Sequence, residues 1–296
     1  MKHTFIFLLC SLLVLLSTGP AYAGRKETKN LELATFNIRY GTPKDTGVRS
    51  WDARRSSCIA CVRDNDFDVV GFQEVLAHQQ EDLKRLLPEY EFEFVGRNDG
   101  TSGEAVGIGY KKDRVKALES GRFWLSPTPD TPSNSVEWGG PQRNRVAVWI
   151  KFEDLKTGKK FYYLSTHMEV GREQAGVRSH SADLVISREM EINREGLPFF
   201  VVGDLNPAGQ TEEMLLKFRA HFQDTFHLAD KLGCRFGPVG TYNGFNPDAD
   251  LSSEGKKGDY IFGKGKFRLY RYEALTDKYD GQYPSDHLAV SVTVRL

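Results

Sequence analysis

The stretch FFVVGDLNPAG, residues 199–209, places four apolar residues directly before polar and turn-forming ones. The first four residues predict a fully buried strand, because the run is short, apolar and rich in aromatic and β-branched side chains. A glycine and a proline then bracket a turn. Side chains alternate along a strand, so Asp204 and Asn206 point to the same side. A turn that caps a strand explains one such pair, and a functional role requires similar endings elsewhere.

Other strand-like runs carry a polar side chain at one end in the same way. LATFNIRYG carries Asn37, FDVVGFQEV carries Glu74, FYYLSTHMEV carries His167, and YPSDHLAV places Asp286 and His287 just before the last strand. Each has an ordinary explanation, such as a turn, a helix-start charge or a satisfied core histidine. These explanations are independent of one another, so five coincidences are improbable. The sequence therefore predicts one site built from the ends of five strands.

The predicted site is rich in oxygen ligands. Carboxylate and amide oxygens without thiolates suit Mg²⁺ or Mn²⁺ rather than zinc. Magnesium leaves coordination positions for water and phosphate oxygens, which favours chemistry at phosphorus over peptide hydrolysis. The sequence has no G-x-S-x-G elbow, P-loop or strand-linked dinucleotide fingerprint. The candidate oxygen ligands are Asn37, Glu74, Asp204, Asn206 and Asp286.

The pattern of apolar runs predicts an α/β fold with more strands than helices. Strands that follow each other directly, as in 92–110 and 146–166, predict antiparallel hairpins, whereas other strands come after a helix. So many strands exceed a single layer, and we expect two mixed sheets packed face to face with helices outside. The predicted strands are 31–37, 68–72, 92–96, 105–110, 146–152, 161–166, 199–203, 259–262, 267–270 and 288–294, and the predicted helices lie near 51–65, 78–87, 173–192 and 211–220.

The N-terminus has the features of a secretory signal peptide. Lys2 precedes an apolar run from Phe5 to Leu16, and Ala-Tyr-Ala ends at Ala23. The run is too short to span a bilayer comfortably. We therefore expect a signal peptide of residues 1–23 and one domain of residues 24–296, secreted or periplasmic after cleavage, without stable membrane insertion.

Composition narrows the possible partners. Lys and Arg together number 40 and Asp and Glu number 40, so the chain has no bulk field for nonspecific polyanion binding. We expect a monomer.

Cys58-x-x-Cys61 lacks the second ligand pair of a zinc site, which favours buried structural thiols, with a disulfide as the alternative.

The order of the motifs N-I-R, Q-E, T-H, G-D-x-N, D-Y-I-F and S-D-H resembles the endonuclease/exonuclease/phosphatase superfamily, which has the DNase I-like fold. The resemblance runs from about Leu31 to Leu296. SGRFWLSPTPD, GTYNGF and GDYIF further resemble exported bacterial members of the nocturnin and catabolite-repressor deadenylase branch. The resemblance implies a four-layer α/β sandwich with its active site at one edge of the two sheets.

The resemblance also implies a role for each matching residue. Glu74 matches the principal metal ligand, with Asn37 beside it and Asp286 near the metal. His167 and Asn206 match groups that hold the scissile phosphate.

Three further residues match the groups that act on water. Asp204 matches the residue that orients or deprotonates water, His287 the imidazole that acts as base or stabilises the pentacoordinate phosphate, and Asp259 the carboxylate that orients this imidazole. The choice of base between Asp204 and His287 stays open. Three positions depart from the pattern: Leu205 stands where Phe is common, Arg39 where DNA-repair members carry Asp, and Glu169 where many relatives carry Asp.

These features predict an exported, Mg²⁺- or Mn²⁺-dependent enzyme that hydrolyses a phosphomono- or phosphodiester by in-line attack of activated water. The substrate stays open between a small phosphoester, such as a sugar or inositol phosphate, a phospholipid headgroup and a nucleic-acid fragment. An exported nuclease is the alternative, and a non-catalytic binding module is disfavoured because Glu74 and the final Asp-His pair are present. Basic residues near Asp259 fit a nucleic-acid groove or, as we favour, solvated hairpin surface: Lys256, Lys257, Lys264, Lys266, Arg268 and Arg271.

Overall fold

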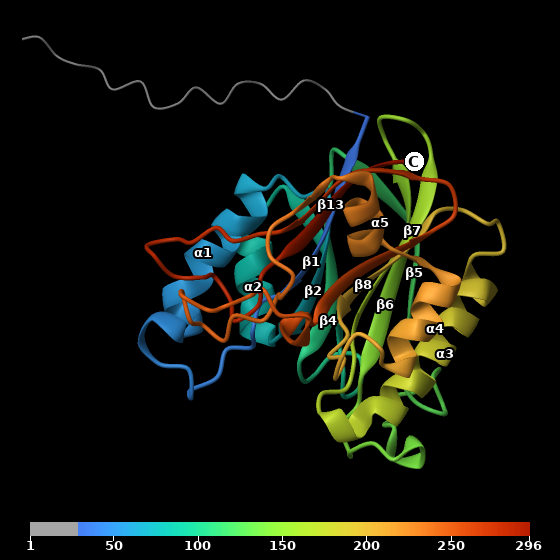
Figure 1. Cartoon of the computed structure of the whole chain (residues 1–296), viewed down its shortest axis with the longest axis horizontal. Coiled ribbons are helices and arrows are strands. Elements are labelled where there is room, and N and C mark those ends of the chain that lie inside the picture. The colour runs from blue at the N-terminus through green and yellow to red at the C-terminus, as the bar shows by residue number, and fades with distance from the viewer. Residues whose placement is uncertain (1–28) are drawn as a thin grey trace, which may run out of the picture.

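The computed structural model describes residues 29–296, and the predicted signal peptide lies outside these residues. The chain forms four layers (Figure 1): helices α1 and α2, a first β-sheet, a second β-sheet, and helices α3 and α4. Two mixed sheets packed face to face with helices outside confirm the predicted fold class.

The first sheet has seven strands in the order β10-β12-β13-β1-β2-β4-β3. β1 pairs parallel with β2 and antiparallel with β13, and β2 pairs antiparallel with β4. The strands are β1 (Leu31–Asn37), β2 (Val69–Val75), β3 (Tyr90–Gly96), β4 (Ala105–Lys111), β10 (Arg235–Phe236), β12 (Arg268–Ala274) and β13 (Val290–Arg295).

The second sheet has six strands in the order β5-β6-β7-β8-β11-β9. It repeats the arrangement of the first, because β7 pairs parallel with β8 while β6 and β11 pair antiparallel on either side. The strands are β5 (Val115–Trp124), β6 (Val146–Asp154), β7 (Lys160–His167), β8 (Phe199–Asp204), β9 (Gln223–Asp224) and β11 (Asp259–Lys264).

The helices lie mainly on the outer faces of the sheets (Figure 1). α1 follows β1 and leads into β2, and α3 follows β7 and leads into β8, so both are crossover helices between parallel strands. The helices are α1 (Trp51–Asp64), α2 (Ala77–Leu86), α3 (Ala175–Ile192), α4 (Glu213–His221) and α5 (Thr225–Leu232), and short 3-10 turns are η1 (Gly47–Arg49), η2 (Val136–Trp138), η3 (Arg172–Gln174) and η4 (Glu254–Lys256).

The main hydrophobic core lies between the two sheets. Leu33 and Val69 of the first sheet belong to the same buried cluster as Val148, Phe161 and Val202 of the second. Strand alternation sends other residues of the same strands outward, where they form a second cluster under α1 and α2 and a third under α3 and α4. Each fully buried aliphatic or aromatic side chain contributes about 1.5–3 kcal/mol relative to exposure, so the inter-sheet core holds the sandwich together.

The predicted strands and helices are all present, with boundaries shifted by a few residues, and both predicted hairpins are antiparallel. Cys58 and Cys61 are buried free thiols on α1, as expected. The prediction missed β5, an edge strand with exposed polar residues and a glycine, the two-residue strands β9 and β10, and the short helix α5. β8 extends one residue beyond the predicted strand, to Asp204.

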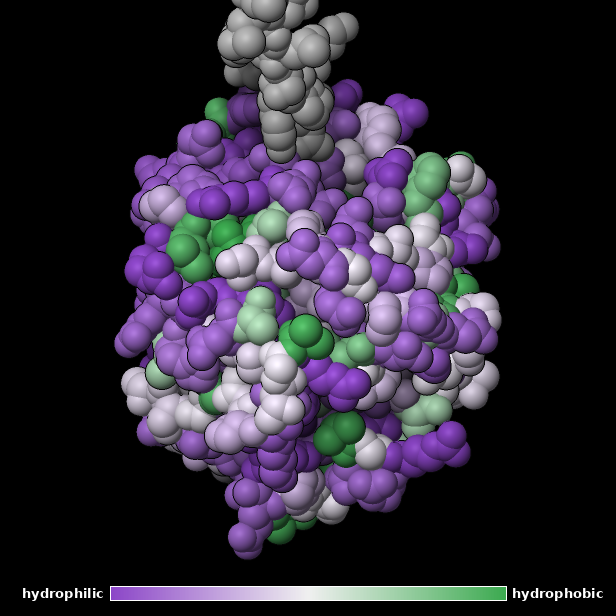
Figure 2. Space-filling model, turned by 90° about the vertical axis from the view of Figure 1, so that its left-hand side faces the viewer, coloured by the Kyte–Doolittle hydropathy of each residue, from purple (hydrophilic) through white to green (hydrophobic). Residues whose placement is uncertain are grey.

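The surface carries few large hydrophobic side chains. On the face shown in Figure 2, hydrophilic residues predominate and the hydrophobic ones lie scattered or in small groups. Scattered apolar side chains of this kind are normal on folded proteins. Of the helices in residues 29–296, none has the length and apolar character needed to cross a membrane.

Replacing Gly203 by alanine should destabilise the fold. The new Cβ would lie against the carbonyl oxygen of Thr166 on β7, well inside contact distance, and φ of Gly203 is 146°, which a Cβ strains. We expect the free energy of unfolding to fall by about 2–3 kcal/mol, measured by urea denaturation. Gly176→Ala is the control: its Cβ would meet nothing within 4 Å on α3, and stability should rise by up to about 1 kcal/mol. Equal stabilities for the two variants would contradict this account.

Candidate active site

The strand directions bring the predicted polar residues to one edge of the sandwich. The carboxyl ends of β1 and β2 meet there, as do those of β7 and β8, because each pair is parallel. β11 and β13 run antiparallel to β8 and β1, so their amino ends lie at the same edge. The residues gathered at this edge are Asn37, Glu74, His167, Asp204, Asn206, Asp259, Asp286 and His287.

An irregularity in β2 directs Glu74 into the site. The register between β2 and β4 shifts between Phe72 and Val75, and Glu74 has a φ of 64°, in the region that favours glycine. Such bulges re-aim a side chain at the end of a strand. Gln73 points the other way and donates from Nε2 to Oγ of Ser165 at 3.1 Å, which links the two sheets. Of this pair, therefore, Glu74 belongs to the site and Gln73 to the core.

The side-chain amide of Asn37 joins the two halves of the site. Its Nδ2 donates to Oε1 of Glu74 at 3.2 Å and to Oδ2 of Asp204 at 3.1 Å. Its Oδ1 accepts from the backbone amide of Arg39 at 3.0 Å, which fixes the orientation of the amide group. Asn37 thus connects a carboxylate of the first sheet to a carboxylate of the second.

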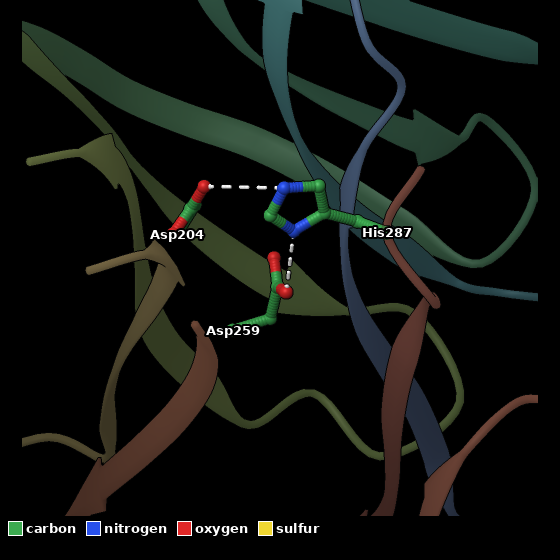
Figure 3. A group of neighbouring side chains, drawn as sticks. All are labelled: Asp204, Asp259 and His287. Carbon is green, nitrogen blue, oxygen red and sulfur yellow. Dashed lines mark hydrogen bonds and ion pairs between the residues drawn. The ribbon is translucent and has the colours of Figure 1, made fainter. Parts of the chain in front are cut away.

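His287 lies between two carboxylates (Figure 3). Its Nδ1 is 2.8 Å from Oδ2 of Asp259, and its Nε2 is 3.7 Å from Oδ2 of Asp204. Thr241 donates to the same Oδ2 of Asp259 at 2.6 Å and so fixes that carboxylate. Asp259 is fully buried, and Asp204 and His287 are nearly so. The three side chains lie in a row, in which Asp259 orients the imidazole toward Asp204.

The two histidines of the site differ in charge. Burial opposes the charged imidazole of His287, but Asp259 and Asp204 outweigh it and raise the pKa of His287 well above its usual value. Burial, helped by nearby cationic groups such as Arg145, lowers the pKa of His167 well below its usual value. At neutral pH, His287 is an imidazolium and His167 is neutral. Of the two contacts of His287, the one with Asp259 is a hydrogen bond, and the one with Asp204 is an ion pair.

Burial is also the main cause of the raised pKa of Asp204, about 6, with Asp259 and Glu74 adding to it and His287 opposing it. A carboxylate with this pKa gains and loses a proton close to neutral pH. This property suits a group that accepts a proton during a reaction.

Glu74 and Asp286 both lie close to the guanidinium of Arg39. Nη1 of Arg39 lies 4.0 Å from Oε2 of Glu74, and Nε of Arg39 lies 3.9 Å from Oδ2 of Asp286. Burial first, and then the charge of Glu74, raise the pKa of Asp286, so bringing a cation to these carboxylates is favourable. The two carboxylates form an all-oxygen donor set, and Asn37 beside them presents its Nδ2 to Glu74 and its Oδ1 to the backbone amide of Arg39. The residues therefore fit a divalent cation that prefers oxygen ligands.

His167 and Asn206 lie on the second-sheet side of the site. Nε2 of His167 is 3.6 Å from Oδ2 of Asp204. Asn206 has a φ of 48°, its backbone amide donates to Oδ1 of Asp204 at 3.1 Å, and its Nδ2 donates to the carbonyl of Met168 at 3.2 Å. Both residues line the cleft, where the resemblance places the groups that hold phosphate.

A cleft of about 540 Å³ opens over these residues. This volume is in the range of small-molecule sites. Two tyrosines, Tyr40 and Tyr242, contribute aromatic surface, and the ring of Tyr242 packs edge-on against His287. The cationic residues that line the cleft are Arg39, Arg97, Arg143, Arg145, Arg172, Lys256 and Lys257.

Two charged residues near the cleft, Lys257 and Glu169, are buried rather than exposed to solvent. Lys257 is 3% exposed rather than solvated, with Nζ 4.4 Å from the ring centres of both Phe226 and Tyr260. Burial lowers the pKa of Lys257 to about 8. Glu169 is buried and makes ion pairs with two arginines that form part of a cationic wall of the cleft, Arg143 and Arg145. It therefore neutralises this wall rather than lining the cleft.

Sequence reasoning missed the residues that complete this wall. Arg97 comes just after β3 and pairs with Glu104, just before β4, at 2.7 Å. Both strand ends lie at the edge that carries the site, because β3 and β4 form an antiparallel hairpin. Extending the strand-end criterion to charged residues after β3 would have identified them.

Known proteins match both the sequence and the fold. Residues 34–287 match the model of the Endonuclease/Exonuclease/phosphatase family. The chain is 33% identical to the mannosyl-6-phosphatase of Bacteroides thetaiotaomicron, with a TM-score of 0.80 over 90% of this chain and 100% of that one. An endonuclease/exonuclease/phosphatase family protein from the same species is also 33% identical, with a TM-score of 0.80 over 90% of this chain and 97% of that one.

The human nocturnin catalytic domain shares the fold at lower similarity, with 19% identity and a TM-score of 0.66 over 90% of this chain and 94% of that one. The expected superfamily is thereby confirmed. The match over most of the sequence, the sandwich and the polar edge agree with one another, and we conclude that the chain is a phosphoric ester hydrolase that belongs to the endonuclease/exonuclease/phosphatase family.

Proposed function

We propose that this protein is an exported, Mg²⁺-dependent phosphatase that hydrolyses small phosphomonoesters of the sugar-phosphate class. The observation that carries the proposal is that one cleft is lined both by Glu74 and Asp286, which share Arg39, and by Asp204 and His287, with Asp259 buried behind the imidazole. One part suits a hard cation, and the other suits the activation of water beside it. Mn²⁺ prefers similar oxygen ligands and is the alternative metal.

Two observations support a small substrate. The mannosyl-6-phosphatase is 33% identical to this chain, and a cleft of about 540 Å³ is large enough for a sugar phosphate. The neutral overall charge of the chain gives no broad field for a polyanionic nucleic acid. Residues 1–23 have the composition of a signal peptide, which is the basis for proposing export.

The side chains have complementary roles in in-line attack by water. Asp204, with a pKa of about 6, accepts the proton of the attacking water. The imidazolium of His287, oriented by Asp259, donates a hydrogen bond from Nε2 to the phosphoryl oxygens, on which negative charge grows during the attack. His167 and Asn206 hold the phosphate from the second-sheet side. Glu74 and Asp286, with Asn37 beside them, would hold a divalent ion, which would supply charge neutralisation for the phosphate and the leaving oxygen.

Removing the carboxylate of Glu74 should abolish metal-dependent turnover. Loss of a ligand that supports charge stabilisation worth several kcal/mol should lower kcat of Glu74→Gln at least about a hundredfold. Mn²⁺ binding, followed by electron paramagnetic resonance of the free ion, should weaken in parallel. Glu81→Gln, on the exposed face of α2, is the matched control and should leave both unchanged. Full wild-type activity in EDTA would disprove the metal dependence.

Asp259 and His287 should behave as one unit in a double-mutant cycle, because Asp259 acts through the imidazole. His287→Ala should lower kcat by about 10²–10⁴-fold, and Asp259→Asn alone should lower it less. Adding Asp259→Asn to His287→Ala should cost almost nothing further. If the loss in the double variant equals the product of the two single losses, the residues act independently.

A substrate panel should distinguish a phosphatase from a nuclease. Mannose 6-phosphate, inositol phosphates, sphingomyelin, oligo(A) and plasmid DNA would be assayed with Mg²⁺ at low and high salt, and Glu74→Gln would control for contaminating enzymes. We expect the highest kcat/KM on a sugar phosphate, with weak dependence on salt, because few phosphates are bound. Rapid plasmid nicking that falls steeply with salt, without sugar-phosphate turnover, would identify an exported nuclease instead.

A further inference from the structure

Two arginines outside the proposed mechanism are buried behind the site. Arg54 on α1 is 2% exposed and Arg178 on α3 is 0% exposed. Burying a guanidinium is costly unless all its donors are satisfied. The groups that satisfy these donors therefore indicate what the two side chains contribute.

Arg54 connects two segments in the half of the site that contains the candidate metal ligands, Asn37, Glu74 and Asp286. Its guanidinium donates to the carbonyl oxygens of Ile38, of Arg39 at 2.5 Å and of Pro284 at 3.3 Å. Cys58, one turn further along α1, donates to the same Pro284 oxygen at 3.0 Å. One helix thus holds the loop after β1 against the segment before β13.

Both of these segments carry or orient the candidate metal ligands. The backbone amide of Tyr40, directly after one of the bound carbonyl groups, donates to Oε2 of Glu74 at 3.1 Å. Ser285, which follows the bound proline, donates to the carbonyl of Asn37 at 2.7 Å and to Oδ1 of Asp286 at 3.3 Å. Displacing the Arg54 guanidinium would therefore loosen Asn37, Glu74 and Asp286 together.

Arg178 makes the equivalent connection in the phosphate-binding half. Its Nη1 donates to the carbonyl oxygens of Glu169 at 2.8 Å and Gly171 at 2.7 Å, in the loop after β7. Its Nε and Nη2 form a bidentate pair with Glu212 at 2.6 and 2.9 Å. Glu212 in turn accepts from the backbone amide of Ala208 at 2.6 Å, in the loop after β8.

These two loops carry the candidate phosphate-binding groups. His167 lies two residues before Glu169, and Asn206 lies two residues before Ala208. Nδ2 of Asn206 also donates to the carbonyl of Met168, between the anchored ends of the loops. Displacing the Arg178 guanidinium would therefore loosen His167 and Asn206 while leaving the metal ligands in place.

The two arginines occupy equivalent places in the repeated halves of the sandwich, on the crossover helix of each parallel strand pair. Among the described residues that line the cleft, neither is present, so each acts through the loops it binds. The planar guanidinium reaches several carbonyl groups in fixed directions, which the single ammonium of lysine does not.

We propose that Arg54 and Arg178 are positioning residues with separate tasks: Arg54 fixes the metal ligands, and Arg178 fixes the phosphate-binding groups. The proposal rests on the proposed function for the assignment of the two halves. If the proposal holds, replacing each arginine weakens the binding of a different ligand. If the two arginines were purely structural, both replacements would only lower the stability of the protein.

The test measures two binding constants on the whole protein, without requiring turnover. Mn²⁺ affinity is followed by electron paramagnetic resonance, and inorganic phosphate affinity by calorimetry with saturating Mn²⁺. Arg54→Lys should weaken Mn²⁺ binding about tenfold or more, as for other residues that orient metal ligands, with phosphate binding little changed. Arg178→Lys should weaken phosphate binding by a similar factor, with Mn²⁺ binding little changed. Arg114→Lys is the control, because Arg114 is 4% exposed and pairs with Asp154 at the opposite edge; it should change neither constant.

Equal effects of both site variants on both constants, or effects no larger than those of Arg114→Lys, would overturn the proposal. If circular dichroism shows that a lysine variant does not fold, Cys58→Ala replaces Arg54→Lys and Glu212→Gln replaces Arg178→Lys. Cys58→Ala should weaken Mn²⁺ binding and Glu212→Gln should weaken phosphate binding, each by a smaller factor than the lysine variant. Wild-type protein that binds Mn²⁺ and phosphate but hydrolyses no phosphomonoester would refute the proposed substrate alone, because the variants still decide the positioning role. Wild-type protein that binds no Mn²⁺ would overturn both proposals.

Discussion

The hydrophobic core between the two sheets is the constraint on which the site depends. The inner faces of both sheets contribute to one buried cluster, which sets the distance and the angle between the sheets. Only at that setting does Asn37 of the first sheet reach Asp204 of the second at 3.1 Å, and His287 reach Asp259 at 2.8 Å. The site is thus a set of hydrogen bonds across a gap whose width is fixed by apolar packing.

The polar edge concentrates opposite charges where water is scarce, and this explains the contrast between its two imidazoles. His287 has two carboxylates within reach and carries a proton, whereas His167 faces the cationic wall that includes Arg145 and stays neutral. Arg39 lies between Glu74 and Asp286 and so reduces the repulsion between these acids. The backbone is also unusual here, since Arg39, Glu74 and Asn206 all have positive φ. Such conformations persist where surrounding packing enforces them.

The repeated halves of the fold give the site its division of labour. Each half has a parallel strand pair, a crossover helix and a buried arginine behind the loops, but the loops carry different groups. The first half supplies Glu74, Asp286 and the imidazole of His287, and the second supplies His167, Asn206 and the carboxylates Asp204 and Asp259. Rigid strand ends hold these groups more precisely than long loops would, because the strand ladders fix the position of each end.

The sequence by itself determined the strands and which of them end in a polar residue, because an apolar run that stops at an Asp, Asn, Glu or His is visible without a structure. It therefore indicated the sandwich and the members of the site, from Asn37 to His287. The tertiary structure decided how these residues are used. It separated Glu74 from Gln73 by a bulge in β2, buried Lys257 among aromatic rings, and paired Glu169 with two arginines. These outcomes depend on contacts between residues far apart in the chain, and burial and charge at such contacts are not encoded in any local pattern.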